Sequence, residues 1–163
     1  MLYRHFTTQE EIDRAYDPMM GQDPLVLVKA WRQRSEASRG RHRVSLDMPY
    51  GPTLAERMDI FHAKASHDEH PKAPVHVFFH GGYWRSLSHR EFSFIVDDLV
   101  NAGITVAVVN YALCPQVRFS ELVRQSQAAI AYLYKHAAEV GVDPEQLSIS
   151  GHSAGGHLCA MLM

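Results

Sequence analysis

The first group of residues whose spacing suits chemistry is a serine between two glycines, Gly151-His152-Ser153-Ala154-Gly155. The apolar run Leu147–Ser150 precedes it and a helix-compatible stretch follows, so the serine is expected on a tight strand-to-helix turn with a positive φ. Such a turn lifts the Ser153 hydroxyl clear of its neighbours, while the two glycines let the backbone pass closely. It also puts the Ala154 N–H at a helix start, where it can donate to an oxyanion. The pattern predicts a nucleophilic serine.

A second motif follows an earlier strand. The apolar run Val75–Phe79 is typical of a buried strand, and it leads into His80-Gly81-Gly82-Tyr83-Trp84. Glycines at a strand end allow main-chain N–H groups to approach a substrate carbonyl oxygen without a side-chain clash. A G-x-S-x-G pattern by itself is equally compatible with a plain Gly-Ser loop. Two such motifs in this order, each at the end of a strand, favour a serine hydrolase.

Together these motifs resemble those of the α/β-hydrolase superfamily, and within it those of the kynurenine formamidases (arylformamidases). The hormone-sensitive-lipase-like esterases are similar, but they typically carry a third glycine where this chain has Tyr83. Tyr83-Trp84 therefore favours the formamidase branch. The segment Tyr111-Ala112-Leu113-Cys114-Pro115 also resembles the Tyr-x-Leu-x-Pro loop of these families. The resemblance covers roughly residues 40–163.

The resemblance implies that Ser153 is the nucleophile, that Gly81, Gly82 and Tyr83 shape the oxyanion loop, and that Ala154 supplies a further N–H. It implies supporting places in the two motifs for His80, Trp84, Gly151, His152 and Gly155. No metal and no organic cofactor are implied. The expected substrate is a small molecule, either an N-formyl amide on an aromatic amine, such as N-formylkynurenine, or a small ester. A short-chain carboxylesterase is the alternative activity.

The main departure from the family concerns the residues that activate the serine. In the family, the acid (Asp) and the base (His) follow well beyond the serine motif, whereas this sequence stops soon after it, at Met163. We therefore expect the amino-terminal part of a longer enzyme, inactive as the isolated chain. A non-catalytic or partner-dependent half-domain is the alternative, and it predicts self-association through an uncovered sheet edge.

Three histidines near the motifs are candidates for the missing base, and geometry disfavours each. His152 sits beside Ser153 on a sharp turn, so it points elsewhere. His157 follows along the helix axis and is expected to project away from the hydroxyl. His80 is expected to hold the Gly-Gly loop by hydrogen bonds. A further segment, His67-Asp68-Glu69-His70, suggests a metal site by composition, but it is not H-E-x-x-H, so a solvated loop is favoured.

The order of expected elements predicts an α/β fold, with a mostly parallel sheet and helices on both faces. Residues 1–40 form a helical segment, with a capping box at Thr8 and a helix over Leu25–Arg34 that Gly40 ends. Residues 41–163 hold the front part of the hydrolase domain. Its expected strands are Arg43–Met48 and Arg57–Ala63, an antiparallel pair, then Val75–Phe79, Ile104–Val109 and Leu147–Ser150, all parallel. One expected helix opens with a capping box at Ser88–Glu91 and stops at Gly103, and its buried stripe is Phe92, Ile95, Val96 and Leu99. A second, amphipathic helix is expected from Phe119 to Gly141, with Phe119 in its apolar stripe.

Composition narrows the class of protein. The net charge is −2 with both signs dispersed, so no nucleic-acid-binding face is expected. Cys114 and Cys159 are not in a metal-ligand spacing, which favours a reducing compartment. The start of the chain is polar and no apolar run is long enough to cross a membrane. We expect a cytoplasmic protein that does not bind membranes.

Overall fold

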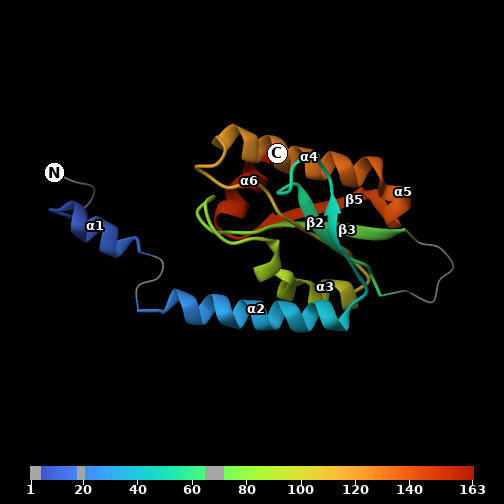
Figure 1. Cartoon of the computed structure of the whole chain (residues 1–163), viewed down its shortest axis with the longest axis horizontal. Coiled ribbons are helices and arrows are strands. Elements are labelled where there is room, and N and C mark those ends of the chain that lie inside the picture. Colours follow the sequence, from blue (N-terminus) through green and yellow to red (C-terminus); the bar gives the residue numbers. More distant parts are fainter. Residues whose placement is uncertain (1–4, 18–20, 65–71) are drawn as a thin grey trace. The chain divides into compact units, whose positions relative to one another are not determined.

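The computed structural model describes residues 5–17, 21–64 and 72–163 (Figure 1). The segment His67–His70 lies outside these residues. The chain divides into two compact units, residues 1–30 and 31–163. The first unit carries α1 (Gln9–Ala15), and its predicted capping box is confirmed: the Glu11 N–H donates to Thr8 Oγ1 at 3.2 Å, and the Thr8 N–H donates to the Glu11 carboxylate at 3.2 Å. The serine motif lies in the second unit.

Helix α2 (Pro24–Arg41) is longer than the Leu25–Arg34 that the sequence predicts. Gly40 lies inside this helix and does not end it, because its backbone keeps a negative φ. Contacts within the second unit stabilise the extension: the buried Ser35 hydroxyl accepts a hydrogen bond from the Phe94 N–H, and Arg39 Nη1 donates to the Ser93 hydroxyl at 2.9 Å. Packing therefore outweighs the weak helix propensity of glycine.

A five-stranded sheet organises the second unit, in the order β1-β2-β4-β3-β5. The antiparallel pair at the start and the three parallel strands are confirmed, since β2 pairs with β1 and β4 in antiparallel fashion and β3 runs parallel to β4 and β5. The strands are β1 (Val44–Pro49), β2 (Arg57–Phe61), β3 (Ala73–Phe79), β4 (Thr105–Val109) and β5 (Val142–Gly151). The α/β class is confirmed.

Each face of the sheet has its own apolar core, and different helices cover the two faces (Figure 1). One face packs against α4 (Phe119–Lys135), α5 (Ala137–Val140) and α6 (Ala154–Leu162). The other face packs against Trp31 of α2, Phe92, η2 (Ser93–Val96) and α3 (Asp97–Asn101), and η1 (His89–Glu91) directly precedes Phe92. The capping box predicted at Ser88–Glu91 is confirmed, but the single helix predicted from it to Gly103 is wrong, because this segment divides into η1, η2 and α3. Phe92, at φ −117°, interrupts it and keeps its ring buried beside Phe78.

Strand β1 contains an irregularity that the sequence pattern does not reveal. Its register with β2 shifts between Ser45 and Met48, and Asp47 between them has φ 52°. The alternation of Val44, Leu46 and Met48 along the sequence predicts one common face, and this is wrong: because of the bulge, Val44 packs on one core and Met48 on the other. Strand β5 also starts earlier than expected, at Val142, with a register shift opposite Pro74. Within the described residues, no helix is both long and apolar enough to cross a membrane.

Candidate active site

Ser153 occupies the sharp turn between β5 and α6, and its side chain is exposed. Its backbone has φ 52° and ψ −114°, so the predicted positive φ is confirmed. A residue with a Cβ holds such a conformation only where its surroundings impose it. The surroundings here are two close backbone contacts. A Cβ on Gly151 would lie 2.3 Å from the Gly155 carbonyl carbon, and a Cβ on Gly155 would lie 2.0 Å from the Phe79 oxygen.

The parallel pairing of β3 and β5 brings the two sequence motifs together. Phe79 and Gly151 are register partners at the ends of these strands. One residue further, the His152 N–H donates to the Phe79 carbonyl at 3.1 Å. The segments that follow the two strands then pack against each other. A Cβ on Gly81 would lie 2.6 Å from His152 Nδ1 and 3.4 Å from Ser153 Cβ. Only a glycine allows the His80–Trp84 loop to approach the serine this closely.

The His80–Trp84 loop leaves main-chain donors free. Gly82, Tyr83 and Trp84 all have positive φ, at 125°, 54° and 58°, and the N–H groups of Arg85 and Ser86 both donate to the Gly82 carbonyl at 3.0 Å. In the described part of the chain, the N–H groups of Gly82 and Tyr83 have no backbone acceptor. The Ala154 N–H opens α6 and so has no partner inside that helix.

His80 is buried and supports this loop rather than the serine. Its Nδ1 lies 2.7 Å from the Gly81 carbonyl, which confirms the predicted hydrogen bond. A carbonyl only accepts, so Nδ1 carries the proton and Nε2 presents a lone pair. Nε2 is buried and has no partner within the described ranges of the chain. Burial lowers the pKa of His80 to about 4, because the charged imidazolium would lose its hydration. The ring is neutral at physiological pH and stacks on Tyr111, 4.2 Å between centroids.

Hydrogen bonds from the segment Tyr111–Cys114 hold both ends of the His80–Trp84 loop. The Tyr111 hydroxyl donates to the His80 carbonyl at 2.5 Å, and the Cys114 N–H donates to the Trp84 carbonyl at 2.8 Å. The buried Gln125 side chain of α4 in turn accepts from the Ala112 N–H at 2.8 Å. The sequence analysis did not single out Gln125, because a glutamine on a helix carries no motif.

Three rings form an aromatic cluster beside the sharp turn at Gly151–Gly155, which we call the elbow. The Trp84 ring lies 5.4 Å from His157 and 5.8 Å from Phe119, and the last two are 5.3 Å apart. The Trp84 Nε1 is buried and has no hydrogen-bond partner among the residues that the structure describes. Phe119 is partly exposed, at 37%. Sequence reasoning placed it only in the apolar stripe of a helix, and its contact with His157 could not be read from spacing.

No base is paired with the serine. Across residues 5–17, 21–64 and 72–163, no side chain makes a hydrogen bond with the Ser153 hydroxyl. The His152 ring packs 6.0 Å from Phe92, the His157 ring belongs to the aromatic cluster, and His80 is engaged with Gly81. Cys114 and Cys159 are free thiols and neither is fully exposed.

Comparison with known proteins identifies a matching family and several similar proteins. Residues 58–163 match the BD-FAE family model. The chain is 30% identical to kynurenine formamidase from Danio rerio, over 91% of this chain and 49% of that protein. It is 28% identical to kynurenine formamidase from Salmo salar, over 95% of this chain and 53% of that protein. The chain thus spans about half the length of these relatives.

Solved structures show the same architecture. A candidate thioesterase from Silicibacter sp. TM1040 superposes with a TM-score of 0.77 at 29% identity, covering 92% of this chain and 54% of that one. A thermophilic esterase from Thermogutta terrifontis superposes with a TM-score of 0.62 at 28% identity, covering 76% and 44%. The matched folds belong to hydrolases that are about twice as long.

Proposed function

The chain is an α/β-hydrolase of the BD-FAE family, and on that premise we propose that it cleaves a small amide or ester through Ser153. The observation that carries the proposal is the strained backbone of Ser153, φ 52°, directly against the glycine loop after β3. A strained turn that exposes a hydroxyl beside free N–H donors has a chemical use and no evident structural one.

The reaction follows from these positions. A general base takes the Ser153 proton, and the oxygen attacks the substrate carbonyl carbon, whose π electrons move to the carbonyl oxygen. The N–H groups of Ala154, Gly82 and Tyr83 donate to that oxyanion. When it collapses, the amine or alcohol leaves with a proton and an acyl-Ser153 remains. Water then attacks the acyl group and releases the acid. Gly81 contributes by letting the donor loop lie against the serine.

An aryl formamide is the favoured substrate, with a short-chain ester as the alternative. Two named relatives are kynurenine formamidases, and the cluster of Trp84, Phe119 and His157 offers an aromatic wall beside the elbow. Aromatic rings pack favourably against other aromatic rings. The esterase alternative is supported by the Thermogutta structure and by an esterase of Gibberella moniliformis that is 29% identical over 74% of this chain.

The full-length protein tests this choice. We expect a higher kcat/KM for N-formylkynurenine than for p-nitrophenyl acetate, and Phe119→Leu should lower the first more than the second. A larger kcat/KM for the acetate in the wild type would favour the esterase. If Ser153→Ala kept both activities, the formamidase and the esterase versions of the proposal would both be contradicted.

The base and the acid are the remaining parts of the proposal. Because no described histidine or carboxylate contacts Ser153, we propose that both groups come from polypeptide that follows the elbow and that residues 1–163 do not turn over by themselves. Reading the coding frame beyond the Met163 codon tests this. An Asp and then a His, each at the end of a predicted strand, are expected.

A stop codon directly after Met163 would support a partner-dependent half-domain instead. Strands β1 and β5 are the two ends of the described sheet, so such a chain is expected to self-associate. Size-exclusion chromatography of residues 1–163 measures this, and a compact monomer would contradict it.

A reducing, cytoplasmic location is also proposed, supported by the two free thiols.

A further inference from the structure

Three ligand-type side chains converge away from the serine, at the start of the sheet. Asp47 comes from the β1 bulge, Asp59 from β2 and His89 from η1. One ligand atom of each lies within 4.8 Å of the other two. The bulge is what brings Asp47 there, since its shifted backbone directs its N–H to Asp59 Oδ1 at 2.9 Å.

His89 is the unusual member of this cluster. It is only 4% exposed, and neither of its ring nitrogens has a hydrogen-bond partner among the described residues. A buried polar group left without a partner is destabilising. Its Nε2 points into the cluster, 3.4 Å from Asp59 Oδ1 and 3.6 Å from Asp47 Oδ1. Asp59 is itself 1% exposed, so two buried ligand groups face each other without a hydrogen bond.

These separations discriminate between the arrangements that could explain the cluster. A hydrogen bond between nitrogen and oxygen spans about 2.7–3.2 Å. Adjacent ligands of an octahedral Mg²⁺ are about 2.9 Å apart, since the metal–oxygen distance is about 2.0–2.1 Å. Ligands of a tetrahedral Zn²⁺ at similar bond lengths are about 3.4 Å apart. The observed 3.4 and 3.6 Å match the tetrahedral spacing.

We propose that Asp47, Asp59 and His89 bind a Zn²⁺ ion, through Asp47 Oδ1, Asp59 Oδ1 and His89 Nε2, with water as the fourth ligand. The ion would join the β1–β2 pair to η1, the first element after the His80–Trp84 loop. Its role would be to fix the exit of that loop. The proposal is independent of Ser153, so the failure of one does not affect the other.

The surrounding charges are compatible with a dication. Arg90 Nη2 donates to Asp47 Oδ2 at 2.6 Å, which leaves Oδ1 for the metal. An ion pair of His89 with the two carboxylates is the competing arrangement, and it needs no metal.

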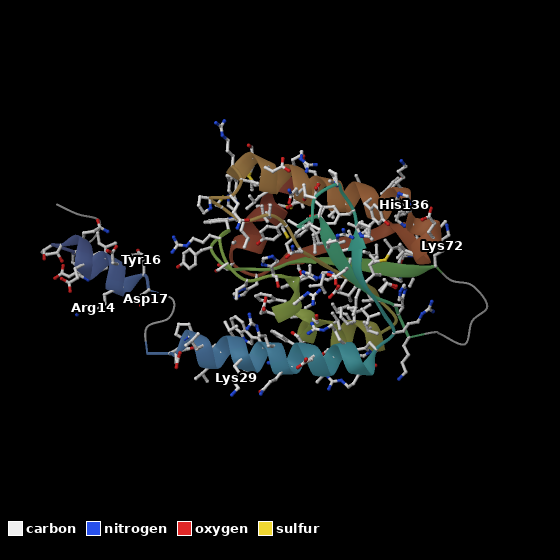
Figure 2. The ribbon with its side chains drawn as sticks, in the orientation of Figure 1. Arg14, Tyr16, Asp17, Lys29, Lys72 and His136 are labelled. Atoms are coloured by element: carbon white, nitrogen blue, oxygen red, sulfur yellow. The ribbon has the colours of Figure 1, made fainter. Side chains whose placement is uncertain are left out.

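Zinc stoichiometry separates the two arrangements. The full protein, treated with chelator, is titrated with Zn²⁺ by equilibrium dialysis as wild type, as His89→Gln and as His136→Gln. His136 lies between α4 and α5, where its ring pairs with Glu139 and stacks on Tyr132, so it is the matched control (Figure 2). We expect one Zn²⁺ fewer in His89→Gln than in the other two proteins. Zinc bound by other surface histidines is present in all three proteins, so it drops out when their stoichiometries are subtracted.

Two further readouts do not depend on activity. Zn²⁺ should raise the melting temperature of the wild type and of His136→Gln but not of His89→Gln. Co²⁺ in place of Zn²⁺ should give the visible absorption of a tetrahedral site only where His89 is present. Should His89→Gln not fold, Asp47→Asn, at a half-exposed side chain, provides the same comparison. Equal zinc stoichiometry in the wild type and the variant would overturn the site.

Discussion

Gly155 packs its backbone directly onto the carbonyl of Phe79, since a Cβ on Gly155 would lie 2.0 Å from that oxygen and 2.7 Å from the His80 oxygen. The first turn of α6 is thereby seated on the end of β3. Because Phe79 leads straight into the His80–Trp84 loop, this contact sets the distance between Ser153 and the loop that is proposed to hold the oxyanion.

Gly155→Ala tests how closely Gly155 packs against the Phe79 carbonyl. The new methyl group meets backbone atoms that cannot rotate away, so we expect a loss of at least about 2 kcal/mol in the free energy of unfolding. Gly156→Ala, one residue along the same helix, is the matched control, because its Cβ would be 3.2 Å from the Gly151 oxygen. Urea unfolding should show a clearly smaller loss for the control, and equal losses would contradict the contact.

The backbone strain at Ser153 should make the folded protein more stable with glycine at this position than with a residue that has a Cβ. Its φ of 52° and ψ of −114° strain any residue with a Cβ, whereas glycine adopts positive φ freely. We expect Ser153→Gly to be about 1 kcal/mol more stable than Ser153→Ala. Both variants lack the hydroxyl, so their difference isolates the backbone. Equal stability in chemical denaturation would mean that the turn is unstrained.

Gly81→Ala should impair catalysis more than substrate binding. Its Cβ would lie 2.9 Å from the His152 carbonyl oxygen, a backbone atom, so the donor loop must move away from the serine. Removal of an oxyanion donor typically costs about 10²-fold in kcat, and we expect a similar loss with little change in KM. Gly40→Ala, on α2 with nothing within 4 Å of the new Cβ, is the control. An unchanged kcat in Gly81→Ala would remove the loop from the mechanism.

His80 should make the fold sensitive to mild acid. Its pKa is about 4 in the folded protein because of burial, against about 6.5 in an unfolded chain. Between these values only the unfolded state binds the proton, so stability falls as the pH drops from about 6.5 to about 4, by up to about 3 kcal/mol.

The variant His80→Asn keeps a donor for the Gly81 carbonyl and removes the titration. Its free energy of unfolding should vary less with pH across this window than that of the wild type. The pKa values of His62 and His76 are also lowered by burial, and they act equally in both proteins. Identical slopes would show that His80 does not titrate differently on unfolding.

Sequence patterns predicted the parts of the fold that depend on local chemistry. The positive φ of Ser153, the hydrogen bond of His80 and the parallel strands all follow from residue type and periodicity. The bulge at Asp47 was missed, because a single inserted residue leaves the hydrophobic alternation looking regular. The break at Phe92 in the helix expected between Ser88 and Gly103 was missed too, since tertiary packing of that ring outweighs the apolar stripe.

Contacts between distant segments could not be predicted in the same way. Asp59 and His89 belong to a strand and a 3₁₀ turn that no motif links, and only the sheet order places them together. The same is true of Gln125, which supports the segment after β4 from α4. Sequence spacing reports which residues share an element, and the fold decides which elements meet.

The most direct test of the central claim is to locate the adduct of a fluorophosphonate on the full-length protein by mass spectrometry. Such a probe reacts with an activated serine and mimics the tetrahedral intermediate. We predict a single adduct on the peptide that contains Ser153, and none in Ser153→Ala. An adduct on another serine, or labelling that persists in the variant, would show that Ser153 is not the nucleophile.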